Sequence, residues 1–222
     1  RRMVYVIEVE GKNDSVIMET VKGLFSDKNK DFVTEVDEQN VILVKDATEL
    51  GSEEEAENIA RMIVDTLHAE AMVRVRVGYG TAVDKLQDIP KSYQEAKMAL
   101  EVGNIFYVES ETISYARLGI GRLIYQLPLP LCKMFIKEIF EAKSPDDFDE
   151  ETLTTINKFF ENSLNVSETS RQLYIHRNTL VYRLDKLQKS TGLDLRVFED
   201  AITFKIALMV VKYMKYMESL EY

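Results

Sequence analysis

Residues 165–192 read NVSETSRQLYIHRNTLVYRLDKLQKSTG. A helix over residues 177–190 would divide its side chains between two faces, because successive residues are rotated by about 100°. The apolar face carries Leu180, Val181, Leu184 and Leu187. The opposite, polar face carries Asn178, Thr179, Tyr182, Arg183 and Lys186. The stretch therefore predicts a helix that packs one side into a core and presents hydrogen-bonding groups on the other.

A shorter helix is predicted just before it. Its apolar and small residues recur at i, i+3, i+4 and i+7, as Val166, Thr169, Ser170 and Leu173. Ser167 is a suitable N-cap for this helix, and Gly192 is a suitable stop for the second one. Residues 174–176 have the length of a tight turn. The pattern predicts a helix-turn-helix whose second helix enters the major groove of DNA, although two ordinary core helices with solvated polar faces share the same periodicity.

The motif VSETSxxLYIHRNTLxYRLxKL, followed by TGLD, is similar to the C-terminal DNA-binding segment of the PucR/CdaR family of bacterial transcription regulators. That segment in turn resembles the Fis-type helix-turn-helix. The match is nearly ungapped, and its one small departure is Ser170, where the family usually has alanine. The resemblance implies a DNA-binding regulator whose absent N-terminal region senses a small metabolite, such as a sugar diacid or a purine-pathway compound.

Eight residues are predicted to face double-stranded DNA, and they are His176, Arg177, Asn178, Thr179, Tyr182, Arg183, Lys186 and Lys189. Backbone N–H groups at a helix N-terminus suit a phosphate, so His176, Asn178 and Thr179 are expected to anchor the helix on the DNA backbone. Arg177 and Arg183 are candidate base readers, because arginine bonds guanine O6 and N7 in bidentate fashion. The tyrosine can meet a phosphate or a thymine methyl, and the two lysines are expected to contact phosphates.

Composition favours a site-selective binder over a protein that coats nucleic acid generally. The chain of 222 residues has 45% hydrophobic residues, enough for one large domain or two modest ones, and a net charge of −10. Acids concentrate at residues 53–55 and 146–151. Residues 171–196 instead carry two acids and six bases, namely Arg171, Arg177, Arg183, Lys186, Lys189 and Arg196. An acidic body with one basic patch weakens DNA contacts made in the wrong orientation.

The cysteine content and hydropathy pattern predict a cytoplasmic protein without a membrane partner. The single cysteine, Cys132, cannot form an internal disulfide and fits a reducing compartment. The most apolar run, residues 206–211, is far shorter than the ~20 residues that a membrane-spanning helix needs. The chain begins Arg-Arg-Met and runs straight into a predicted strand, so we expect it to be part of a longer protein.

The first half alternates strand-like and helix-like patterns in the order β-α-β-β-α-β-α-β. The expected strands are residues 3–9, 32–36, 41–44, 73–77 and 105–108, and the expected helices are residues 14–25, 52–69 and 91–102. This order predicts an α+β fold with helices over a mixed sheet. It also resembles a GGDEF-type nucleotidyl cyclase fold, and the PucR/CdaR family carries a GGDEF-like domain at this position.

The GGDEF enzyme signature would fall on the hairpin, where residues 36–41 read VDEQNV. Both glycines that let a nucleotide approach the backbone are missing. Asp37 and Glu38 can bind a divalent metal in principle, but adjacent acids at a turn are usually just solvated. We expect no catalytic residue, metal or cofactor here. Two alternatives remain: a nucleotide cyclase or phosphodiesterase, and a module that binds a nucleotide or metabolite without turning it over.

Two further features are expected to be structural and not to form a binding site. Gly78-Tyr79-Gly80 lacks the Gly-rich continuation of a phosphate loop and is expected to end a strand. His68 has no cysteine or second histidine nearby, so a metal site has no support.

The rest of the chain is predicted to be helical. Residues 115–142 form helices broken at residues 127–130, residues 143–151 form an exposed connector, and a helix over residues 151–162 opens the DNA-binding unit. The predicted domains are residues 1–115 (GGDEF-like), 116–150 (helical connector) and 151–222 (DNA-binding). The helix over residues 199–217 is apolar on most of its circumference. It must be buried in its own domain or against a partner, and a homodimer or higher homo-oligomer is expected.

Overall fold

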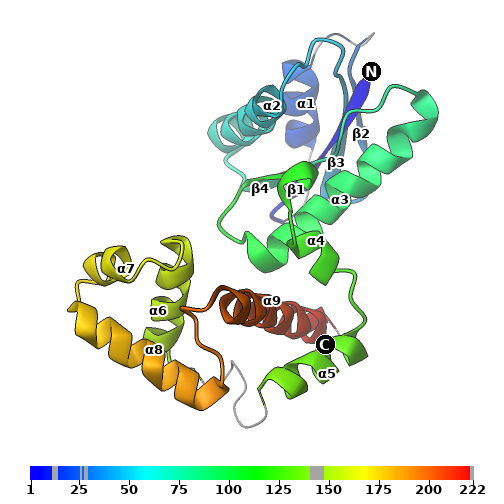
Figure 1. Cartoon of the computed structure of the whole chain (residues 1–222). Helices are drawn as coiled ribbons and strands as arrows, with labels where there is room; N and C mark the ends of the chain where they lie inside the picture. Colours follow the sequence, from blue (N-terminus) through cyan, green and yellow to red (C-terminus); the bar gives the residue numbers. More distant parts are fainter. Residues whose placement is uncertain (12–14, 26, 28–29, 141–147, 221–222) are drawn as a thin grey trace. The chain divides into compact units, whose positions relative to one another are not determined.

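The computed structural model describes residues 1–11, 15–25, 27, 30–140 and 148–220, and Figure 1 shows its helices and strands. The chain forms two compact units, Arg1–Tyr125 and Gln126–Tyr222. The first unit contains, in order, β1 (Arg2–Val9), α1 (Ser15–Leu24), β2 (Phe32–Glu35), β3 (Asn40–Asp46), α2 (Glu53–Thr66), β4 (Val75–Tyr79), α3 (Ile89–Phe106), β5 (Thr112–Ser114) and α4 (Gly121–Ile124).

The first unit is built on a five-stranded sheet in the order β2-β3-β1-β4-β5. The central strand β1 pairs antiparallel with β3 and β4, whereas β4 and β5 run parallel. Alternate residues of β1 enter two cores: Tyr5 and Ile7 pack with α1 and α2, and Val6 packs with α3 on the opposite face. The predicted element order and the mixed-sheet α+β fold are therefore confirmed.

The last predicted strand of this unit was placed wrongly. Residues 105 and 106 end α3, and the strand that joins the sheet is β5, Thr112–Ser114. The apolar run at residues 105–108 has the composition of a strand, but Ile105 is 6% exposed and continues the buried face of α3. Tertiary packing of a long amphipathic helix overrides this local β propensity.

Two glycines allow α3 to lie directly on β4. A Cβ on Gly78 would come 2.5 Å from the carbonyl oxygen of Ala96, and a Cβ on Gly80 would come 2.1 Å from that of Ser92. Any side chain at these positions would collide with the helix backbone. β4 ends at Tyr79, so the interpretation of this glycine pair as a strand end is confirmed.

In the described residues of the second unit, every regular element is a helix: α5 (Leu129–Ile139), α6 (Glu150–Glu161), α7 (Val166–Gln172), α8 (Arg177–Thr191) and α9 (Phe198–Leu220). Its core joins α6, α8 and α9 through Ile156, Phe159, Leu180, Leu184, Leu187, Phe204 and Ala207. One face of α9 is buried, while Ile202 on another face remains 40% exposed. Most of the apolar side chains of α9 are thus buried or partly buried within its own unit.

Helix α5, which we assigned to a connector, packs on α9 in the second unit. The Tyr213 hydroxyl of α9 also donates a 3.1 Å hydrogen bond to the Leu127 carbonyl, just before α5. The compact units divide after Tyr125, whereas the predicted boundaries lie at residues 115 and 150. Residue 14 and most of the predicted connector, residues 143–147, lie outside the described residues. Within the described part of the chain, no helix is long and apolar enough to cross a membrane.

Candidate nucleic-acid interface

Helix α7 begins with a different cap from the one expected. Asn165, in extended backbone geometry, accepts a 3.0 Å hydrogen bond at its side-chain oxygen from the Glu168 N–H. The predicted N-cap, Ser167, instead lies inside the first turn, and its carbonyl accepts a hydrogen bond from the Ser170 hydroxyl. Asparagine and serine are equally good N-caps, so the two candidates could not be separated by residue type.

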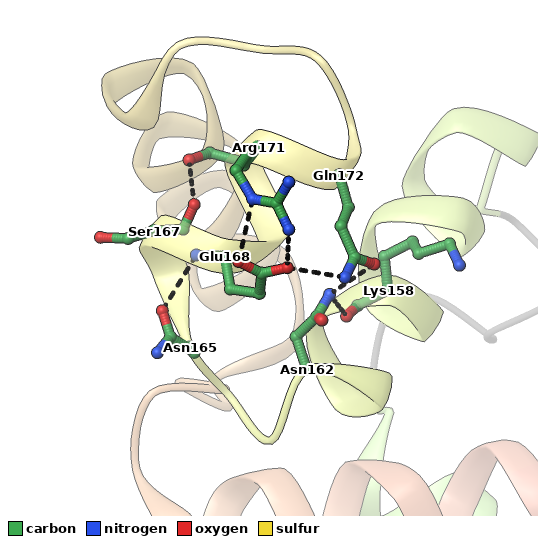
Figure 2. Close-up of polar contacts among 8 residues, drawn as sticks. Lys158, Asn162, Asn165, Ser167, Glu168, Arg171 and Gln172 are labelled. Atoms are coloured by element: carbon green, nitrogen blue, oxygen red, sulfur yellow. Dashed lines mark hydrogen bonds and ion pairs between the residues drawn. The ribbon is translucent and has the colours of Figure 1, made fainter.

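A chain of side-chain hydrogen bonds connects α6 to α7 (Figure 2). The Asn162 amide donates to the Lys158 carbonyl at 2.8 Å and to the Gln172 side chain at 3.2 Å. Gln172 in turn donates to the Glu168 carboxylate at 2.9 Å, and the Arg171 guanidinium also donates to that carboxylate. Our sequence analysis missed this network, although the i, i+3 and i, i+4 spacing of its α7 members was a usable signal.

The turn between α7 and α8 places an aromatic side chain in solvent. Tyr174 has a backbone φ of +55° and is 96% exposed. A positive φ is uncommon for a residue other than glycine, and turns of this kind often contain glycine. Ile175 is only partly exposed and packs against the helical core, as expected of the residue that pins the turn.

His176 is the N-cap of α8. Its Nδ1 accepts a 3.2 Å hydrogen bond from the Asn178 N–H, and its carbonyl accepts one of 2.9 Å from the Thr179 N–H. We expected these N–H groups to be free for a phosphate, but His176 already occupies both. The histidine ring therefore serves the helix terminus, and any DNA contact by Asn178 and Thr179 falls to their side chains.

The two faces of α8 are those that the periodicity predicted. Leu180, Leu184 and Leu187 are at most 4% exposed and lie in the core, with Val181 at its margin. Gly192 ends the helix with a φ of +76°, which confirms the predicted stop. Of the predicted site residues, the exposed ones are His176, Arg177, Asn178, Thr179, Tyr182, Lys186 and Lys189.

Arg183 is the one predicted site residue whose side chain turns inward. Its guanidinium donates a 3.0 Å hydrogen bond to the Thr155 hydroxyl of α6 and forms an ion pair with Glu151, and its side chain is 24% exposed. Thr155 is 1% exposed and donates a 2.9 Å hydrogen bond to the Glu151 carbonyl. Arg183 thus ties α8 to α6, a contact that the helical wheel of α8 alone cannot reveal.

Three of the six basic residues of the patch at residues 171–196 form ion pairs with neighbouring acids. Arg171 pairs with Glu168, and Arg196 pairs with Asp185 and Asp194. The hydrogen bonds that the Arg196 guanidinium donates to the Asp194 carboxylate are the main cause that raises the pKa of Arg196. With Arg183 also paired, the basic residues of the patch without an ion pair to any described residue are Arg177, Lys186 and Lys189. These three cations lie on the exposed face of α8 and remain available to phosphates and bases.

The hairpin of the first unit uses its acid to build a turn. One carboxylate oxygen of Asp37 accepts 2.8 Å hydrogen bonds from the N–H groups of Gln39 and Asn40. These contacts, led by that from Gln39, lower the pKa of Asp37. His68 lies in a π-helical turn, Leu67–Ala71, after α2. Within the described residues, no group of three or more His, Cys, Asp and Glu side chains could hold a metal ion.

Comparison with known proteins assigns a family to each unit. Residues 1–102 match the GGDEF-like domain, and residues 152–210 match the PucR C-terminal helix-turn-helix domain. The purine catabolism regulatory protein of Bacillus subtilis (strain 168) is 27% identical over 170 residues, which cover 75% of this chain and 32% of that protein. The carbohydrate diacid regulator of Escherichia coli (strain K12) is 26% identical over 219 residues, which cover 94% of this chain and 57% of that protein.

The chain therefore spans less than two thirds of either relative. Among solved structures, a regulator of polyketide synthase expression from Bifidobacterium adolescentis aligns with a TM-score of 0.40 and 13% identity, over 97% of this chain and 81% of that chain. The two domain matches lie in the same order as the two compact units. The chain therefore joins a GGDEF-like domain to a PucR C-terminal helix-turn-helix domain, and the curated proteins to which it is similar are PucR/CdaR-type regulators.

Proposed function

We propose that this chain is the DNA-binding part of a transcription regulator and that α8 is its recognition helix. The observation that carries the proposal is the division of α8 into a buried leucine face and an exposed face with three cations that form no ion pair with a described residue. A helix of this kind can lie in the major groove while its apolar face holds it on the domain. The family match to a helix-turn-helix domain over residues 152–210 supports the same assignment.

Within this site we assign different roles to the predicted residues. Arg177, at the first position of α8, is the base reader, because its exposed guanidinium can bond guanine in bidentate fashion. Lys186 and Lys189, farther along the helix, contact phosphates. Arg183 positions α8 through α6 instead of reading a base. Asn178, Thr179 and Tyr182 add side-chain contacts at the groove edge.

We further propose that the GGDEF-like unit is not an enzyme. Its hairpin lacks both signature glycines, and the carboxylate of Asp37 is engaged in the turn. The related proteins are named as regulators, which fits a coupling or scaffolding role. A cyclase is therefore the less supported alternative.

The remaining partners are proposals of the same kind. Helix-turn-helix proteins often bind two half-sites as dimers, so we propose a homodimer acting in the cytoplasm. The names of the two relatives refer to purine catabolism and to carbohydrate diacids. We propose that a small metabolite controls this protein through a region beyond this chain.

Selection of bound sequences from random double-stranded DNA with the purified chain tests the proposed function. We expect enrichment of a defined sequence, and an inverted repeat would support the dimer. Recovery of no enriched sequence, together with equal binding to every duplex, would contradict sequence-specific recognition by α8.

A further inference from the structure

Arg171 on α7 is strongly exposed and yet held in one orientation. Its side chain is 74% exposed, but Nε donates to one oxygen of Glu168 at 3.0 Å and Nη2 donates to the other at 2.5 Å. Figure 2 shows the guanidinium lying along the carboxylate. No hydrogen bond from Nη1 to any described residue is present, so one edge of the guanidinium stays open.

The carboxylate that holds Arg171 is itself fixed in place. Gln172 donates to Glu168, and Asn162 donates to Gln172 and to the Lys158 carbonyl of α6 (Figure 2). Hydrogen bonds from Arg171, the largest cause, lower the pKa of Glu168 and keep the carboxylate ionised. An arginine restrained in this way loses less side-chain entropy when it binds a further group than a free one does.

The position of Arg171 in the helix-turn-helix identifies that further group. The first helix of such a motif crosses the DNA backbone while the second lies in the groove. Arg171 is the one basic residue of α7, and it is exposed on the side of the helix away from the buried Thr169 and Ser170. A planar guanidinium with a free edge matches the geometry of a phosphate oxygen pair.

We propose that Arg171 binds a backbone phosphate of DNA beside the bases read by α8, with Glu168 as the group that orients it. This inference rests on the proposed function, because it requires DNA to bind α8. It assigns a specific role on α7 to Arg171, which the sequence placed only in the basic patch of residues 171–196. The contact is independent of base sequence and positions the duplex across α7 and α8.

Fluorescence anisotropy with a selected duplex and a random duplex at several salt concentrations tests the inference. Arg171→Gln is expected to weaken binding to both duplexes by a similar factor, about fivefold near physiological salt, and to reduce the slope of log K against log[salt] by about 0.9. Arg171→Lys should keep the slope, because it keeps the charge. It should still bind more weakly than the wild type, because an ammonium cannot form the two-pronged contact with Glu168.

Arg61→Gln is the matched control, because Arg61 is also an exposed arginine in an ion pair but lies on α2 of the first unit. It should leave both affinities and the salt slope unchanged. An Arg171→Gln variant that binds like the wild type, with the same slope, would overturn the inference and leave the proposed function intact. A wild-type chain that binds neither duplex would overturn both.

A duplex with one neutral methylphosphonate linkage gives an independent measurement. Scanning this linkage along each strand should reveal a position at which neutralisation weakens the wild type but has no effect on Arg171→Gln. Equal effects on the two proteins at every position would overturn the inference.

Discussion

The guanidinium of Arg183 donates a 3.0 Å hydrogen bond to the hydroxyl of Thr155 and so joins the recognition helix α8 to α6. Thr155 is buried, and Arg183 completes the contact with an ion pair to Glu151. This contact lies on the flank of α8, between its buried and exposed faces, where the Arg183 side chain is 24% exposed. We therefore propose that Arg183 positions α8 for DNA recognition.

Replacement of Arg183 by glutamine is expected to lower the free energy of unfolding of the second unit by about 1–3 kcal/mol, because a buried hydroxyl loses a charged donor. Affinity for the selected duplex should fall more than affinity for random DNA. The slope of log K against log[salt] should not change, because Arg183 touches no phosphate. Denaturant unfolding and anisotropy measure these quantities.

Glu151→Gln is the matched control, because it weakens the same contact without removing a positive charge. It should reproduce part of the loss of specificity. A variant Arg183→Gln of normal stability whose salt slope falls by about 0.9 would show instead that Arg183 contacts a phosphate.

The two faces of α8 predict opposite effects for neighbouring residues. Leu184→Ala should lower the free energy of unfolding by about 2–5 kcal/mol, because the leucine is 1% exposed and its removal leaves a cavity. Tyr182→Ala should change stability by less than about 0.5 kcal/mol, because Tyr182 is 68% exposed, but it should weaken DNA binding. Chemical denaturation and anisotropy on both variants check this pair. A large stability loss in Tyr182→Ala would mean that the exposed face also supports the fold.

The N-cap of α8 provides a third prediction. His176→Ala removes the acceptor for the Asn178 N–H and is expected to destabilise the second unit by about 0.5–2 kcal/mol. His176→Asn should recover most of this loss, because asparagine is a strong N-cap residue. If Asn and Ala give the same melting temperature, the ring of His176 does not stabilise α8 through the cap.

The first unit is expected to leave GTP unchanged in the presence of magnesium. Nucleotide analysis by chromatography, with an active GGDEF cyclase as positive control, tests this directly. Product formed at a rate that scales with the concentration of the chain, and that is lost in Asp37→Ala, would contradict the proposal that this unit is non-catalytic.

Much of the architecture followed from hydrophobic periodicity. The continuous apolar run at residues 3–9 predicted the strand β1, and the leucine spacing of α8 predicted which of its side chains enter the core; both were assigned correctly. Local sequence signals failed where two residues or two element types fit the same stretch equally well. Asn165 and Ser167 are both good caps, and the run from Ile105 has strand-like composition inside a helix.

The role of Arg183 could not be predicted from the sequence for a different reason. A helical wheel places it near the polar face of α8, but the wheel contains no information about α6, which supplies Glu151 and Thr155. The orientation of Arg171 depends likewise on Asn162, nine residues earlier at the C-cap of α6. Such contacts between elements require the packed arrangement of the helices.

The most direct test of the account is the effect of Arg177→Ala on the affinity for the selected duplex and for random DNA, measured by anisotropy at two salt concentrations. We predict that the variant loses about 1–3 kcal/mol of binding free energy on the selected duplex, with a much smaller loss on random DNA, because the lost contact is to a base. Equal losses on both duplexes would show that Arg177 is a phosphate contact. No loss on either would contradict the assignment of α8 as the helix that reads the DNA sequence.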